Sequence, residues 1–152
     1  MKEERFAHLN LIAGEAELKL EFVNDVPARV GQVLTHPLLG RIDTAENILA
    51  NKVTAALHRS EPKDLADIWG FCCQKDLSLL AAITNAHSRA AGAFPADLGR
   101  VLCSVTRTDW ESIRWITPPP QDLFLSQLDA LGETLLLPPS AVGARPRTGS
   151  GT

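Results

Sequence analysis

The sequence lacks any run of apolar residues long enough to span a bilayer, and its first residues, MKEERFAHL, lack the apolar stretch of a signal peptide. It has only three cysteines, and two of them, Cys72 and Cys73, are adjacent, which makes a poor disulfide framework. Its four histidines do not have the spacing of zinc ligands. The net charge of −3 does not suit a broad nucleic-acid-binding surface. We therefore expect a cytoplasmic protein with reduced thiols and no membrane partner.

At 152 residues, of which 45% are hydrophobic and 22% charged, the chain has the length and composition of one globular domain. We expect an α+β fold in which an incomplete β-sheet, made of a hairpin and short strands, is followed by a helical bundle. This domain should cover residues 1–137. Residues 138–152 have few large apolar side chains, so we expect a disordered tail there.

A β-hairpin is predicted between residues 5 and 23, with its turn at residues 13–16. On the returning strand Leu20 and Phe22 point to one side and Glu21 to the other. Such a pattern is typical of a half-buried sheet with an ordinary solvated face, and a functional role for Glu21 is the alternative. Residues 24–41 are punctuated by proline and glycine and should contain turns and short strands.

Two consecutive helices are predicted in the next segment. Asp43 is the expected N-cap of the first helix, and Glu46 should complete a capping box. The helix should run to about His58, because Ser60-Glu61-Pro62 can end one helix and start another.

Four charged side chains in these helices need an explanation. The helical period places Lys52 and Arg59 within the apolar stripe of the first helix, and Asp64 and Asp67 lie one turn apart at the start of the second. A buried cation without a partner is costly, so such a lysine is paired, extends its ammonium to solvent, or is functional. A structural salt bridge to Asp64, Asp67 or Glu21 and a functional site are both consistent with the pattern.

The remainder of the chain shows no catalytic pattern and should form a helical bundle. We expect Trp110 and Trp115 to anchor a core or an interface. Helix is predicted to about residue 115, with a start at Asp109-Trp110-Glu111, then a rigid connector at Pro118-Pro119-Pro120 and a last amphipathic helix at residues 122–131.

The spacing of Asn51-Lys52, Arg59 and Lys63-Asp64-Leu65-Ala66-Asp67 resembles that of the AbiEii-type nucleotidyltransferases, the toxins of type IV toxin–antitoxin (abortive infection) systems. In that family a hydrophobic–acid–hydrophobic strand precedes a helix with Asn-Lys, a downstream Arg and an Arg/Lys-Asp-x-x-Asp helix start. Here Leu20-Glu21-Phe22 matches the strand. The resemblance covers roughly residues 5–71, and the helical remainder resembles the family only in character.

The resemblance implies a nucleotidyltransferase fold with a helical C-terminal region. Enzymes of this fold transfer a nucleotide from a nucleoside triphosphate, using two Mg²⁺ ions held by three carboxylates. Glu21 would be the third metal carboxylate, and Lys52 and Arg59 would bind the nucleotide. Asp64 and Asp67 would orient the lysine or activate the acceptor. The implied partners are a nucleoside triphosphate, a cognate antitoxin protein, and tRNA or another nucleic acid as acceptor.

The chain also departs from the family pattern. The family has a Gly-Gly/Ser loop followed by an Asp-x-Asp strand, which supplies the first two metal carboxylates. This sequence has no Asp-x-Asp, and its only Gly-Ser is Gly149-Ser150. We therefore expect a truncated or degenerate form, the C-terminal part of such an enzyme, that is inactive alone because one carboxylate does not hold two metals.

Two other functions fit the same residues. The chain is alternatively a non-catalytic interaction domain that binds an antitoxin or a nucleic acid through the face carrying Lys52 and Arg59. In the third reading it is a helical adaptor in which the four charges form a structural network only.

Overall fold

The computed structural model describes residues 6–23, 31–87 and 94–137. The strands are β1 (Phe6–Ala13), β2 (Ala16–Val23), β3 (Leu34–His36) and β4 (Gly40–Ile42). The helices are α1 (Ala45–Arg59), α2 (Pro62–Trp69), the π-helix η1 (Gly70–Gln74), α3 (Leu79–His87), α4 (Pro95–Cys103), α5 (Arg107–Ser112) and α6 (Gln121–Leu136). The predicted tail, 138–152, lies outside the described residues.

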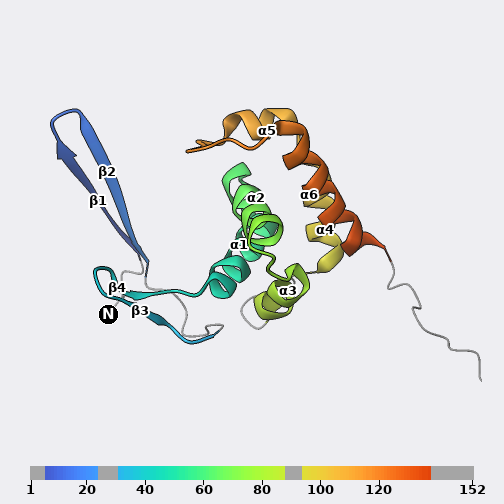
Figure 1. Cartoon of the computed structure of the whole chain (residues 1–152), viewed down its shortest axis with the longest axis horizontal. Helices are drawn as coiled ribbons and strands as arrows, with labels where there is room; N and C mark the ends of the chain where they lie inside the picture. The colour runs from blue at the N-terminus through green and yellow to red at the C-terminus, as the bar shows by residue number, and fades with distance from the viewer. Residues whose placement is uncertain (1–5, 24–30, 88–93, 138–152) are drawn as a thin grey trace, which may run out of the picture.

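The predicted α+β class is confirmed (Figure 1). Two antiparallel hairpins, β1–β2 and β3–β4, precede helices that pack on one another. The strands form two separate two-stranded sheets and not the single partial sheet that the sequence suggested. Among the described strands, β3 and β4, three residues each, pair with each other and not with the first hairpin.

The first hairpin forms where the alternating pattern predicts it. Its strands pair from Phe6 opposite Val23 to Ala13 opposite Ala16, and Gly14, with a φ of +63°, makes the turn. The register puts only apolar residues on one face: Ala7, Leu9, Leu11, Ala13, Ala16, Leu18, Leu20 and Phe22.

This apolar face is not covered, which makes the expectation of a half-buried sheet wrong for the described part of the chain. Leu9, Leu11, Leu18 and Phe22 each keep more than half of their surface exposed, between 51% and 55%. In Figure 1 the hairpin stands apart from the helices. The alternation therefore encodes the strand pairing without identifying what covers the sheet.

Because its apolar face is open, we expect Leu11→Lys to leave the stability of the helical body nearly unchanged. A side chain that is already 51% exposed loses little burial when it is replaced, so the free energy of unfolding should change by less than about 0.5 kcal/mol. Denaturant unfolding followed by circular dichroism measures this change. A loss above about 1 kcal/mol would show that the face is buried in solution.

Helix α1 begins with a different cap from the predicted one. Thr44 is the N-cap, and its side chain accepts a hydrogen bond from the backbone N–H of Asn47. Asp43 instead accepts bonds from the Thr44 backbone N–H and the Asn47 side-chain amide. The predicted capping box of Asp43 and Glu46 is therefore wrong, because Thr44 is the N-cap and the third helical position is Asn47.

The predicted break between the two helices is confirmed. Ser60 closes α1 in a left-handed conformation, with a φ of 48°. Glu61 precedes α2, and Pro62 occupies its first turn, where a missing N–H costs nothing. This tight connection turns the start of α2 back toward the end of α1.

The chain beyond Trp69 is less continuously helical than predicted. The π-helix η1 follows α2 directly, and residues 75–78 separate it from α3. Helix α5 starts at Arg107, two residues before the predicted start, because Thr106 and Asp109 form a capping box. Helix α6 is longer than predicted and ends at Leu136.

The core lies among the helices, and Trp69, Trp115 and Phe124 form an aromatic cluster within it. The ring of Trp115 lies 6.5 Å from that of Trp69 and 5.4 Å from that of Phe124, both edge-to-face. The prediction that Trp110 and Trp115 anchor packing is confirmed, because both rest against this core. Within the described residues, no helix combines the length and apolar character needed to cross a membrane.

Candidate functional site

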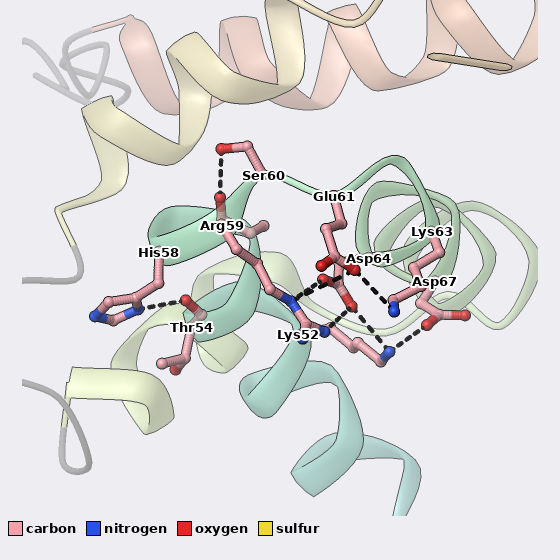
Figure 2. A network of polar contacts seen from close by, with 10 residues as sticks. Lys52, Thr54, His58, Arg59, Ser60, Glu61, Lys63, Asp64 and Asp67 are labelled. Carbon is pink, nitrogen blue, oxygen red and sulfur yellow. Dashed lines mark hydrogen bonds and ion pairs between the residues drawn. The ribbon is translucent and has the colours of Figure 1, made fainter. Parts of the chain in front are cut away.

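The four charged residues singled out from the sequence meet at the junction of α1 and α2 (Figure 2). Lys52 and Arg59 come from α1, and Asp64 and Asp67 come from α2. We call these four residues the junction cluster. The reversal at residues 60–61 brings them together although Lys52 and Asp67 are fifteen positions apart in the sequence.

Asp64 is the centre of the junction cluster, and its side chain is completely buried. Its Oδ1 accepts a hydrogen bond from Lys52 Nζ at 3.0 Å and one from Arg59 Nη2 at 3.1 Å. Its Oδ2 accepts a bond from Arg59 Nε at 2.8 Å, so the arginine contacts both carboxylate oxygens. A buried carboxylate with two cationic donors is satisfied electrostatically.

These contacts keep Asp64 ionised. Burial works to raise the pKa of its carboxyl group, but the hydrogen bonds from Arg59 and Lys52 and their positive charges outweigh burial and lower the pKa. Asp64 therefore serves as a fixed negative charge that holds both cations in place.

Lys52 bridges the two aspartates. Besides its bond to Asp64, its Nζ lies 2.6 Å from Asp67 Oδ2. Burial works to lower the pKa of Lys52, but the hydrogen bonds to Asp67 and Asp64 outweigh it and raise the pKa. The lysine side chain keeps 26% of its surface exposed, so its ammonium is positioned by α2 without being sealed from solvent.

Arg59 is less buried than the helical period predicted, since its side chain is 48% exposed. The difference arises because Arg59 is the last residue of α1, where the helix leaves the core. Its hydrogen bond to Asp64 is the main cause that raises the pKa of Arg59. The guanidinium therefore lies at the surface, and Asp64 binds one of its edges through Nε and Nη2.

Sequence reasoning missed two further members of this surface, Glu61 and Lys63. Lys63 Nζ lies 2.8 Å from Glu61 Oε2, and the same carboxylate lies 3.8 Å from Arg59 Nε. The sequence suggested Glu61 only as a helix cap, and Lys63 only as part of the Arg/Lys-Asp-x-x-Asp helix start. With them, three cations face three carboxylates, so the surface carries no net charge (Figure 2).

Glu21 does not join the junction cluster. It lies on the exposed face of β2, where Lys19 Nζ pairs with its Oε1 at 2.7 Å. The hydrogen bond from Lys19 lowers the pKa of Glu21, with a smaller Coulombic contribution from Lys63. No group of three or more His, Cys, Asp and Glu side chains within the described ranges is arranged to hold a metal ion.

The chain has one Asp-x-Glu pair, Asp109-Trp110-Glu111, but it has a different role from a metal-binding strand. Both acids belong to α5, where Asp109 makes the capping box and Glu111 pairs with Arg107 at 2.9 Å. It therefore does not supply the missing carboxylates.

The geometry assigns different capacities to the members of the junction cluster. Asp64 is buried and accepts hydrogen bonds from both Lys52 and Arg59, so it holds these two side chains in position. Asp67 is 46% exposed and has one ion pair, with Lys52, so an anionic ligand could replace it there at modest cost. The cluster can thus offer one ammonium and one guanidinium to an anion.

Comparisons with models of known protein families, with curated proteins and with solved structures give no match to this chain.

Proposed function

We propose that the α1–α2 unit is the nucleotide-binding half of an AbiEii-type nucleotidyltransferase, in which Lys52 and Arg59 bind the triphosphate of a nucleoside triphosphate. The observation that carries the proposal is that Lys52 and Arg59 both bind the buried carboxylate of Asp64, while Asp67 pairs with Lys52. These are the residues of the resemblance, and their meeting at the helix junction supports a shared role.

Binding would proceed by exchange of anions at Lys52. The triphosphate oxygens would replace Asp67 as partners of the ammonium, while Asp64 holds the lysine and the arginine in place. A lysine suits this role because its ammonium binds phosphate as a point charge, and an arginine edge binds phosphate oxygens in pairs.

Transfer of the nucleotide would need Mg²⁺ and more carboxylates than this cluster offers. Of the acids in the resemblance only Glu21 would be a metal ligand, and it lies outside the cluster in an ion pair with Lys19. We therefore assign nucleotide binding to this chain and transfer to a complete form of the site.

The binding site can be located with two lysine variants. Lys52→Ala should weaken binding of Mg²⁺·nucleoside triphosphate by about tenfold or more, because it removes a positioned cation. Lys63→Ala removes a nearby cation of the same sign, whose ion pair within the described residues is with Glu61, and should change affinity by less than about threefold. Isothermal titration calorimetry with each of the four triphosphates measures both effects. Equal effects of the two variants would contradict a specific role for Lys52.

Asp67 gives a test in the opposite direction. Because Asp67 competes with the phosphate for Lys52, Asp67→Asn should strengthen triphosphate binding by about threefold or more. Weaker binding by Asp67→Asn in the same titration would show that Asp67 supports the ligand and does not compete with it.

A second candidate function is a non-catalytic interaction domain for a protein partner such as an antitoxin. The observation that favours it is the uncovered apolar face of the β1–β2 hairpin. The face around Lys52 and Arg59 suits a nucleic acid less well, because its charges cancel. A purified complex with a partner that Leu11→Lys disrupts and Lys52→Ala preserves would favour this function, whereas the reverse pattern would reject it.

A further inference from the structure

A pocket of about 830 Å³ adjoins the junction cluster and shares Asp67 with it. One wall is formed by α2 and the first residue of η1, and the other by residues 112–117 after α5. Its apolar lining includes Trp69, Ile113, Trp115 and Ile116. A volume of this size suits a small organic molecule.

The aromatic walls of the pocket are fixed in place. Trp69 Nε1 donates a hydrogen bond to the Gln127 side chain at 2.8 Å, and Trp115 Nε1 donates one to the backbone carbonyl of Trp110 at 3.0 Å. Because both indole N–H groups already donate hydrogen bonds within the protein, these rings offer apolar surface to the pocket. Flat apolar ligands gain most from such surface.

Of the charged residues that line the pocket, all but Arg114 belong to an ion pair within the described residues. Glu61 is paired with Lys63 at 2.8 Å, and Asp67 is paired with Lys52 at 2.6 Å. Arg114 lines the same pocket and is exposed, and it makes no ion pair or hydrogen bond with any residue in the described ranges. Among the described residues, Arg114 is therefore the one charged residue lining this pocket that has no ion pair.

A missing side chain leaves part of the pocket open. Gly70 lines the pocket, and a Cβ added to it would have no neighbouring atom within 4 Å. Its backbone has φ of −61° and ψ of −43°, which any residue adopts. A larger side chain at this position would therefore occupy the pocket without straining the backbone.

We propose that this pocket binds a small organic monoanion with a flat apolar ring, the ring packing against Trp69 and Trp115 and the anionic group binding Arg114. The proposal is independent of nucleotide binding at the junction cluster, because it uses neither Lys52 nor Arg59. Aromatic carboxylates and sulfonates share the required chemistry.

Two probes of equal shape separate the ring from the charge. Naphthalene-1-sulfonate is a flat monoanion, and naphthalene-1-sulfonamide is its neutral counterpart. Titration of each into the full chain, followed by ¹H–¹⁵N correlation spectra, should move the indole signals of Trp69 and Trp115 and the amide signal of Gly70. The sulfonate should bind about fivefold more tightly than the sulfonamide, as expected for one ion pair at an exposed arginine. Shifts confined to the β1–β2 hairpin would overturn the proposal.

Variants assign the two contributions. Arg114→Gln should bring the affinities of the two probes within about twofold of each other, because only the ion pair is lost. Gly70→Leu should weaken binding of both probes by more than about tenfold by filling the pocket, while Gly70→Ala should have little effect. The proposal fails if the preference for the sulfonate survives Arg114→Gln, or if Gly70→Leu binds both probes normally. Because Arg114 is exposed, Arg114→Gln should leave the fold intact. Its titrations therefore test the proposal even if Gly70→Leu perturbs the fold.

Discussion

Replacement of Lys52 and Arg59 together by methionine should destabilise the protein by about 3–5 kcal/mol, while each single replacement should cost no more than about 1 kcal/mol. Methionine keeps an unbranched apolar stem and a good helix propensity, so the change is chiefly one of charge. After either single replacement, Asp64 retains one cationic partner. After both, a completely buried carboxylate has lost all the ion pairs that the structure shows for it.

A third substitution tests this explanation. Adding Asp64→Asn to the double variant removes the unpaired buried charge, so about 1 kcal/mol or more of stability should return. Chemical denaturation of the five proteins at pH 7 gives the comparison. If the double variant loses only the sum of the single losses, and Asp64→Asn lowers stability further, the buried charge is not what Lys52 and Arg59 compensate.

The pH dependence of stability should differ in sign between these proteins. In the wild type the pKa of Asp64 is lowered on folding, so its contribution is present at neutral pH and is lost as the pH falls toward and below the ordinary range of an aspartate. Without Lys52 and Arg59, burial alone acts on Asp64 and raises its folded-state pKa. The double variant should then gain stability relative to the wild type as the pH falls from 7 to about 4.

Gly132→Ala should be the second strongly destabilising change, with a loss of about 2–4 kcal/mol. Helices α4 and α6 pack closely where Gly99 and Gly132 face each other. A Cβ on Gly132 would lie 2.5 Å from Cys103 Sγ and 2.7 Å from the Gly99 carbonyl oxygen, distances that force the helices apart. The usual gain in helix propensity from Gly to Ala, about 0.5–1 kcal/mol, is too small to offset this.

Gly70→Ala is the matched control for this change. The same methyl group at Gly70 meets no atom within 4 Å, so its effect on stability should be neutral or slightly favourable. Thermal unfolding of the two variants under one set of conditions makes the comparison. Adding Cys103→Ala to Gly132→Ala should restore part of the loss, because the nearest clashing atom is removed. Equal melting temperatures for Gly132→Ala and Gly70→Ala would contradict the close packing of α4 and α6.

Local patterns explain which elements were predictable. The hairpin follows from strict alternation around Gly14, and the break between α1 and α2 follows from Pro62. The cap at Thr44 was missed because Asp43, Thr44 and their neighbours satisfy several capping patterns one residue apart. In η1, the sequence GFCCQ gives no signal that separates a π-helix from an α-helix.

Long-range proximity explains what the sequence did not show. The pairing of Lys52 with Asp64 and Asp67 was one of two interpretations of the same pattern, and only the fold shows that the pairs form. The pocket at Arg114 joins segments more than forty residues apart, so no spacing motif predicts it. Likewise, the sequence shows Gly99 and Gly132 only as two residues of low helix propensity, and the close contact between their helices is known only from the fold.

The central proposal is that the junction cluster binds a triphosphate, and the most direct test is calorimetric titration of the unmodified chain with Mg²⁺ and each of the four nucleoside triphosphates. The expected result is saturable binding of at least one triphosphate with a dissociation constant below about 1 mM, and much weaker binding of the corresponding nucleoside, because the proposal has Lys52 and Arg59 bind the phosphates. Absence of binding for all four triphosphates, or equal binding of nucleoside and triphosphate, would contradict the proposal.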